Sequence, residues 1–514
     1  MSVQTFNVIQ KISPVAKFTF LLILFVITCI AGIISLLEAI HFFQFLLSDD
    51  APQVVSQAIQ QLRANPTLEN TKILGAELWG LSSLSNVSHY VDSRLLEQGL
   101  YYASMPKTNQ ALLFVHVVLG GFCMLLGALQ FWPSFRKRYM TIHRKIGTVY
   151  IATAPFSVVM AMIYLVKTAP HHLYDHLIAW IALWIFGAFA LLSIFMAIRA
   201  IRNKKIYEHQ AWMALSFSSL LVAPLLRWDW ALLVSLFPHI DQETLNLVTM
   251  GMMLPQTLLI GYILVVINRQ FNRPMSQRKP ESFALRISNI FLVLSPLWYA
   301  VAIGSTVIVG LYFSIGGLSG LKFAHTLIPH ELIIREEQVI SDLGFRKWLL
   351  VLTNGAALIL GIYTLQALLK ATAKTLSKPV HLFGKTAAIF ALIAGGLAIS
   401  VGSQIGLQPD RVLLAGGTMY IINGAFLVLF SMIFLVAQYR QQFAIMKESM
   451  VFLICMLPYL SSYVLTLWVL QFIHLPTDYV IAGQGFAVPI GFSTGLLFVA
   501  FLYVVYGQAT REHN

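Results

Sequence analysis

The chain has 514 residues, of which 58% are hydrophobic and 11% are charged. Soluble globular domains carry about 25% charged residues, so this composition excludes that class and predicts a polytopic helical membrane protein. The net charge of +13 would suit a nucleic-acid partner, but the Lys and Arg residues concentrate in every second loop, so we expect a lipid bilayer as the partner and no nucleic acid.

We expect about twelve transmembrane helices, because about 20 apolar residues suffice to cross a bilayer. The first apolar run is longer than that of a signal peptide, and no cleavage site follows it. The three cysteines lie within predicted spans without a CxxC motif, so we expect no disulfide framework, zinc site or covalently attached haem. The predicted spans cover residues 17–47, 110–132, 145–167, 174–200, 211–237, 245–268, 287–314, 347–370, 382–402, 411–437, 449–473 and 484–507.

One long loop, residues 48–109, follows the first span and is expected on the outer side. Its stretch "QVVSQAIQQLRANP" has apolar residues at helical spacing and predicts an amphipathic helix on the membrane or over the bundle. The expected apolar face contains Val54, Val55, Ala58, Ile59 and Leu62.

The basic loops lie on one side of the predicted bundle. Their clusters are Arg136–Lys145, Arg199–Lys205, Arg269–Arg286 and Lys370–Lys385. Because cytoplasmic loops are enriched in Lys and Arg, both termini are expected in the cytoplasm, and we expect an integral protein of a bacterial inner membrane.

The chain divides into two similar halves, residues 1–268 and 287–514, joined by a polar cytoplasmic linker at 269–286. Short strings recur in the same order: "YEHQ" and "YRQQ", "FPHI" and "FIHL", "GMMLP" and "GFAVP". We therefore predict two parallel six-helix repeats. His116 corresponds to Asn354 and His209 to Gln441, so the second half is predicted to be a degenerate copy that keeps the scaffold.

Four histidines lie on four consecutive spans of the first half. His116 and His176 are expected at the outer level, and His143 and His209 at the inner level. A bis-histidine haem b needs two imidazoles on facing helices. These four residues are therefore the predicted iron ligands of two haem b groups, or His143 and His209 are the ligands of a single inner haem. The alternative is that each histidine is an ordinary interfacial residue.

Three further residues complete the predicted cofactor site. Arg144 follows the inner histidine, Arg227 lies near the outer pair, and both are predicted partners of haem propionates. Gly147, one turn after His143, would let a flat macrocycle approach the backbone. Alternatively, Gly147 eases helix packing, and Arg227 pairs with Asp229 or Glu38 or anchors the helix at the interface.

The string "HVVLGGFCMLLGALQF…IHRKIGTVY…EHQAWMALSF…LLR", within residues 110–267, resembles an uncharacterised bacterial membrane-protein family known by a domain-of-unknown-function label. The residues that carry it are His116, His143, Arg144, Gly147, Tyr150, His209, Trp212, Met213 and Arg227. The alternating histidine levels are also similar in arrangement to transmembrane ascorbate-reducible cytochromes b, a similarity that implies two bis-histidine haems.

Three functions remain open on these patterns. The first is a haem b protein for transmembrane electron transfer, a membrane oxidoreductase that takes electrons from a quinol or another small-molecule donor. The second is a transporter built on the two parallel six-helix repeats. The third is a haem-free structural or assembly subunit of the membrane, in which the histidines are interfacial.

Overall fold

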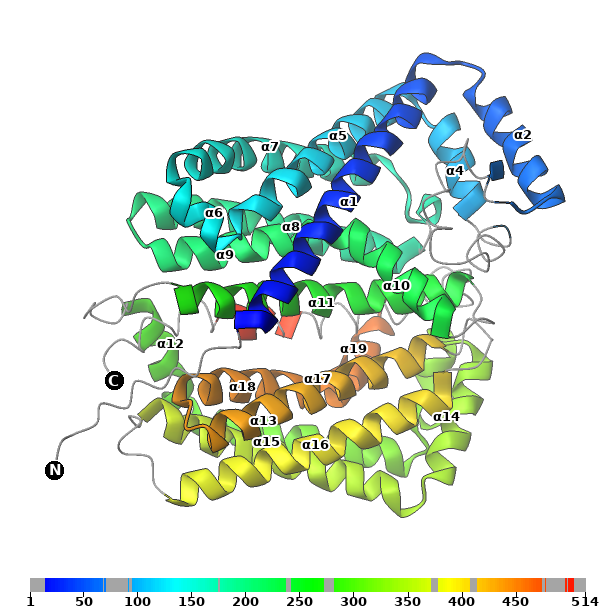
Figure 1. Ribbon diagram of the computed structural model, residues 1–514. Helices are drawn as coiled ribbons and strands as arrows, with labels where there is room; N and C mark the ends of the chain where they lie inside the picture. Colours follow the sequence, from blue (N-terminus) through cyan, green and yellow to red (C-terminus); the bar gives the residue numbers. More distant parts are fainter. Residues whose placement is uncertain are drawn as a thin grey trace. The chain divides into compact units, whose positions relative to one another are not determined.

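The computed structural model describes residues 14–67, 69–70, 91, 95–173, 176–236, 242–271, 282–370, 378–406, 414–473, 477, 495–496 and 498–502. Within these ranges every regular element is a helix (Figure 1). The long apolar helices confirm the prediction of an all-α polytopic membrane protein.

Two compact units make up the chain. Of the described residues, those within 15–271 form the first unit, and residue 14 and those from 282 onward form the second. The division after Phe271 falls inside the stretch 269–286 that we predicted as a linker; residues 272–281 of that stretch lie outside the described ranges.

The first unit contains ten described α-helices and one short 3-10 helix, η3 (Pro170–His172). The α-helices are α1 (Pro14–Leu47), α2 (Ala51–Ala64), α4 (Leu95–Ser104), α5 (Lys107–Gln130), α6 (Pro133–Arg138), α7 (Met140–Lys167), α8 (His176–Arg202), α9 (Ile206–Ser219), α10 (Val222–Leu236) and α11 (Gln242–Phe271).

The second unit contains eight described α-helices and the 3-10 helices η4 (Gly317–Gly320) and η5 (Lys322–Thr326). The α-helices are α12 (Ser282–Val293), α13 (Ser295–Ser314), α14 (His330–Asp342), α15 (Phe345–Lys370), α16 (Lys378–Gly406), α17 (Leu414–Tyr439), α18 (Phe443–Met456) and α19 (Tyr459–Leu470).

Among the described residues, nine helices are long and apolar enough to cross a bilayer, and a tenth span results if α9 and α10, bent by 54°, form one crossing. These ten correspond to ten of the twelve predicted segments. The predicted segment 245–268 lies in α11, which has only a shorter apolar part, Pro255–Asn268. The twelfth, 484–507, falls largely outside the described residues, so the number twelve stays a prediction.

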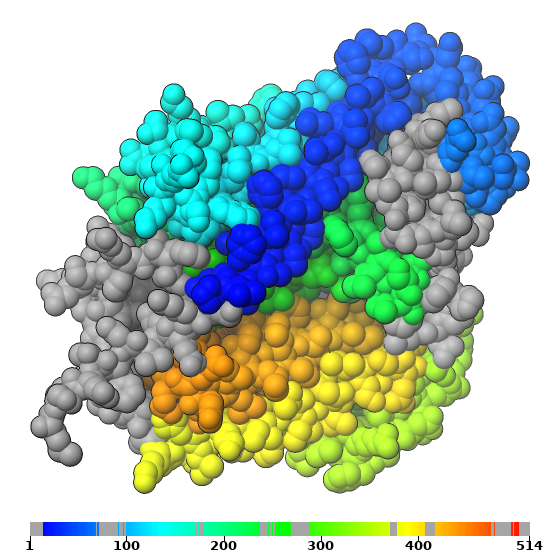
Figure 2. Space-filling view, in the orientation of Figure 1, coloured from blue at the N-terminus to red at the C-terminus, as the bar shows by residue number. Residues whose placement is uncertain are grey.

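Helix α1 crosses the outside of the first unit as a ridge (Figures 1 and 2). It meets α5 where Gly32 and Gly121 face each other, and a side chain on Gly121 would press on the Gly32 carbonyl. Small residues at such crossings allow close helix packing in membranes. Much of the remaining surface of α1 is apolar and exposed, including Ile23, Ile33 and Ile40, as expected for a helix that faces lipid.

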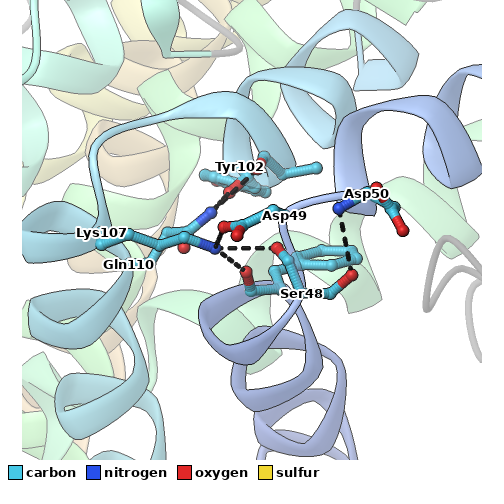
Figure 3. Close-up of polar contacts among 8 residues, drawn as sticks. Ser48, Asp49, Asp50, Tyr102, Lys107 and Gln110 are labelled. Atoms are coloured by element: carbon cyan, nitrogen blue, oxygen red, sulfur yellow. Dashed lines mark hydrogen bonds and ion pairs between the residues drawn. The ribbon is translucent and has the colours of Figure 1, made fainter.

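The C-terminal end of α1, at the level that we predicted as outer, is held by Lys107 at the start of α5. Lys107 Nζ donates hydrogen bonds to the carbonyls of Phe45 (2.9 Å) and Ser48 (2.8 Å) and lies 3.5 Å from the Asp49 carboxylate (Figure 3). The last carbonyls of a helix have no partner within the helix and carry partial negative charge, so an ammonium group satisfies them.

The amphipathic helix predicted in the outer loop is α2. Its buried face contains Val55, Ala58, Ile59 and Leu62, as predicted, but Val54 is exposed. Val54 lies 100° from Val55 around the helix axis, which turns its side chain away from the centre of the buried face. Helix α2 packs against α4 (Figure 1).

A shared backbone feature relates the two halves. Lys204, between α8 and α9, and Gln441, between α17 and α18, are the two non-glycine residues with positive φ in the described part of the chain, at 58° and 53°. Each is followed by a 14-residue helix and then a break. If these two turns are equivalent, His209 corresponds to Met446, five residues on, and not to Gln441.

Glycines bring α16 and α17 of the second unit together. A side chain on Gly395 or Gly402 would overlap the facing backbone at Gly424 and Gly417. A buried carboxylate, Glu336 on α14, also lies in this unit; it accepts hydrogen bonds from the hydroxyls of Tyr312 and Tyr420.

Candidate functional site

The inner histidines lie on two helices whose registers are fixed by one hydrogen bond. Tyr150 Oη of α7 and Ser216 Oγ of α9 lie 3.0 Å apart and are buried. His143 precedes Tyr150 by two turns, and His209 precedes Ser216 by the same two turns. Helices α7 and α9 are separated by the single span α8, so they run in the same direction. The hydrogen bond therefore places His143 and His209 at one level, on facing sides.

The two imidazoles interact with each other and with a third group. His143 and His209 lie within electrostatic range of one another, and Arg136 of the short helix α6 interacts with both. The Arg136 guanidinium is half-buried and donates to Asn268 Oδ1 of α11 at 3.3 Å. Five helices of the first unit thus contribute to one polar cluster, which we call the inner site: His143, His209, Arg136, Asn268 and Gln130.

One histidine of the inner site has the hydrogen bond that orients a metal-bound imidazole. His209 Nδ1 lies 3.0 Å from the Ala197 carbonyl, which favours the tautomer that leaves Nε2 for a ligand. Within the described part of the chain, His143 Nδ1 and Gln130 Nε2 are buried without a hydrogen-bond partner. Buried polar atoms are normally paired, so each of these two leaves a hydrogen-bonding position for a ligand or a water.

Arg144 and Gly147 differ in how they relate to this site. Arg144 and Lys145 are exposed, and Arg144 lies within electrostatic range of His143 alone, whereas Arg136, which the sequence analysis did not select, lies within electrostatic range of both histidines. Among the described residues, a Cβ added to Gly147 would meet only Gln130 Oε1, at 3.4 Å. Gly147 therefore does not serve close helix packing, and it leaves open space beside the inner site.

The outer histidine His116 lies on α5 and is tied to α7. Its Nδ1 lies 3.0 Å from the Ser157 carbonyl and 3.1 Å from Ser157 Oγ, while Ser157 Oγ donates to the His116 carbonyl at 3.0 Å. His176 begins α8, but its side chain lies outside the described residues. The outer pairing of His116 with His176 therefore stays a prediction.

His116 lines a cavity of about 330 Å³ inside the first unit. The cavity lies between α1, α5, α7, α8 and the bend of α9 and α10, with α4 at its outer end, and its walls are mostly apolar. Ligand pockets begin at about this volume and combine apolar walls with a few convergent polar groups. Its polar groups include His116, Ser157, Glu38, His41 and Arg227.

Arg227 forms an ion pair inside this cavity. Its Nη2 lies 2.6 Å from Glu38 Oε1 of α1. Of the two carboxylates that we considered as partners, Asp229 instead accepts a hydrogen bond from Gln256 Nε2 at 3.0 Å. Both members of the Glu38–Arg227 pair are mainly buried, and an ion pair within a membrane-spanning bundle is costly and usually functional.

Residues 113–265 match a family model described as "Predicted membrane protein (DUF2306)". The protein is an integral membrane protein. The matched residues contain α5, apart from its first turns, and continue through most of α11, so they include His116, both inner histidines and Arg227. This match supports the resemblance to an uncharacterised membrane-protein family and leaves its activity open. No curated protein and no solved structure matches the chain.

Five residues described above were missed by sequence reasoning. Arg136 was counted only as a topological charge, and the other four were not considered: Gln130, Ser157, Ser216 and Asn268. Ser157 lies seven residues after Tyr150, and Tyr150 lies seven after His143, so the three form one stripe of α7. This seven-residue spacing of polar residues on an apolar helix could have identified Ser157 from the sequence.

Proposed function

We propose that this protein binds haem b at the inner site, with His143 and His209 as axial ligands, and transfers electrons as a membrane oxidoreductase. The observation that supports this most is the Tyr150–Ser216 hydrogen bond, because it sets two histidines at one level on facing, parallel helices. We further propose that both termini face the cytoplasm of a bacterium, following the basic loops.

The residues of the inner site fit the group. Two imidazoles approach from α7 and α9, and the Ala197 carbonyl orients one of them. Arg136 supplies a half-buried cation for a propionate, and Gly147 leaves space. Haem b bound here would supply a one-electron carrier. The protein's own part is to hold both rings neutral and aligned, and to keep a cation beside them.

A second haem on His116 and His176 would give the two-haem form. It requires both imidazoles to converge at the outer level. The hydrogen bond between His116 Nδ1 and the Ser157 carbonyl leaves Nε2 for an iron atom, as an axial ligand requires. Arg227, the predicted propionate partner, is however already paired with Glu38. We therefore place the function on the inner site.

Transport is the second candidate. It is favoured by the 54° bend between α9 and α10, because discontinuous helices form the binding sites of many transporters. The Glu38–Arg227 pair lies at the cavity beside that bend. A transporter without haem would be colourless, so the same measurement separates the two functions.

The test is the oxidised and reduced absorbance spectrum of the purified protein, with the haem-to-protein ratio. We expect haem b bands in the parent, their loss in His143→Ala and in His209→Ala, and no change in His381→Ala. His381 is a matched control because it lies at the same place in α16, four residues into the helix, as His143 in α7. The proposal is contradicted if the parent protein shows no bands of bound haem b after reconstitution with haem. It is also contradicted if both His143→Ala and His209→Ala keep these bands.

A further inference from the structure

The cavity beside His116 has mostly apolar walls with polar groups on several of them, and α1 closes one side of it. Helix α1 contacts α5 at Gly32, and Lys107 holds its outer end at Phe45 and Ser48. Between these two attachments, its residues Ser35 to Phe45 line the cavity. The opposite side of the same helix is exposed and apolar. A ligand dissolved in the bilayer would therefore reach the cavity beside α1.

Two polar groups face the cavity from different walls. His116 comes from α5, and Arg227 comes from α10. Because His116 Nδ1 donates to the Ser157 carbonyl, its Nε2 is the acceptor of the neutral ring. Arg227 can only donate. A ligand that complements both walls thus needs a hydroxyl donor at one end and an acceptor oxygen at the other.

The charge of the site restricts the ligand further. Arg227 is neutralised by Glu38 at 2.6 Å, so an anionic head such as a fatty-acid carboxylate would have to displace a carboxylate already in place. Haem carries two negatively charged propionates, and both would have to be placed beside this one neutral ion pair. A neutral ligand avoids both costs, because burying an unpaired charge is expensive.

We propose that this cavity binds the head of a membrane quinol: a neutral, flat ring with two opposed oxygens and an apolar chain. One hydroxyl donates to His116 Nε2, the opposed oxygen accepts from Arg227, and the ring lies between apolar walls that include Phe42, Phe186 and Trp230. The assignment deepens the proposed function by naming a redox partner for the inner haem, but binding itself does not depend on haem.

The experiment measures binding of a decyl-substituted benzoquinol in detergent, by quenching of tryptophan fluorescence, since Trp230 lines the cavity. It uses the His143→Ala background, so that haem absorbance does not interfere and a failure of the haem proposal leaves this test intact. We expect saturable binding. His116→Leu should weaken it by at least about tenfold, the consequence of losing one buried hydrogen bond.

Two further variants complete the design. Ala161→Trp places a bulky group in the cavity wall and should abolish binding while leaving every polar group present. His381→Leu makes the same chemical change in the second unit and should bind like the background. The oxidised quinone should bind more weakly than the quinol, because its carbonyl cannot donate to His116 Nε2.

Three results would overturn the inference. The first is equal quinol binding in the background, His116→Leu and Ala161→Trp. The second is displacement of the quinol by palmitate at similar concentration, which would indicate an anionic lipid. The third is a lower haem-to-protein ratio when His116→Leu is made in the parent protein, which would assign the cavity to an outer haem.

Discussion

Tyr150 and Ser216 are 66 residues apart in the chain, and their hydroxyls form a buried hydrogen bond of 3.0 Å between α7 and α9. Removing either hydroxyl leaves the other buried and unpaired. We expect Tyr150→Phe and Ser216→Ala each to destabilise the protein by about 1 kcal/mol. The double variant should cost little more than either single one, since both remove the same interaction. Thermal unfolding in detergent measures this, and additive losses would show that the hydroxyls act independently.

Arg136 should affect the haem of the inner site more than Arg144. Arg136 is half-buried and lies within electrostatic range of both inner histidines, whereas Arg144 is exposed and reaches only His143. We expect Arg136→Ala to lower haem retention and to change the reduction potential, because a half-buried positive charge near the iron is removed. Arg144→Ala should have a smaller effect on both, because solvent screens an exposed charge. Potentiometric titration of the reduced band distinguishes them, and a larger effect of Arg144→Ala would contradict this arrangement.

Gly147 should tolerate a small side chain better than a large one. In the part of the chain that the structure describes, the only atom within contact of an added Cβ is Gln130 Oε1, at 3.4 Å. We therefore expect Gly147→Ala to fold and keep its haem, and Gly147→Leu to fold but retain less haem, because the longer side chain enters the space beside His143. The haem-to-protein ratio of both variants tests this. Equal and full ratios would mean that the macrocycle does not lie along this face.

Breaking the Glu38–Arg227 ion pair on one side should be worse than removing it altogether. Arg227→Leu leaves the Glu38 carboxylate buried and uncompensated, which costs about 3–5 kcal/mol for a well-buried pair. Both groups keep some exposure, so we expect the lower end of that range or less. The double variant Glu38→Leu with Arg227→Leu should recover most of the loss. Unfolding temperatures measure this, and a double variant less stable than Arg227→Leu would contradict it.

Glu336 should make the second unit less stable as the pH rises. Burial raises the pKa of this carboxyl from 4.5 to about 7, although the hydroxyls of Tyr312 and Tyr420 oppose the shift. The folded state then binds more protons than the unfolded state between these values, so stability falls as the pH rises from 4.5 to 7 and is constant above. The loss is at most about 3 kcal/mol.

Glu336→Gln removes the titration while keeping an oxygen that accepts from both tyrosines. We expect its unfolding temperature to vary less between pH 5 and pH 8 than that of the parent, and to exceed the parent's at pH 8. Glu337→Gln, next in sequence, is the matched control. The same pH profile in all three proteins would show that Glu336 is not the titrating group.

Composition and apolar runs were enough to predict the fold class and the ends of most spans, because a bilayer accepts only helices of a certain length and polarity. The common level of His143 and His209 follows from the constant rise per residue along a helix, while the outer pairing of His116 with His176 stays a prediction. The sequence also predicted α2, because the amphipathic spacing of its residues can be recognised without knowing which elements lie beside it. In each case the determining interaction is local, or is with lipid.

Tertiary structure alone decided which groups meet. Arg227 lies two residues from Asp229 in the sequence, yet it pairs with Glu38, 189 residues away, because helix geometry places residues i and i+2 on different faces. Likewise Arg144 is adjacent to His143 but lies on the exposed side of α7 and reaches that histidine alone, whereas Arg136 comes within range of both histidines from a separate short helix. Neighbours across a helix bundle depend on rotation and crossing of whole helices, which result from packing of side chains far apart in the chain.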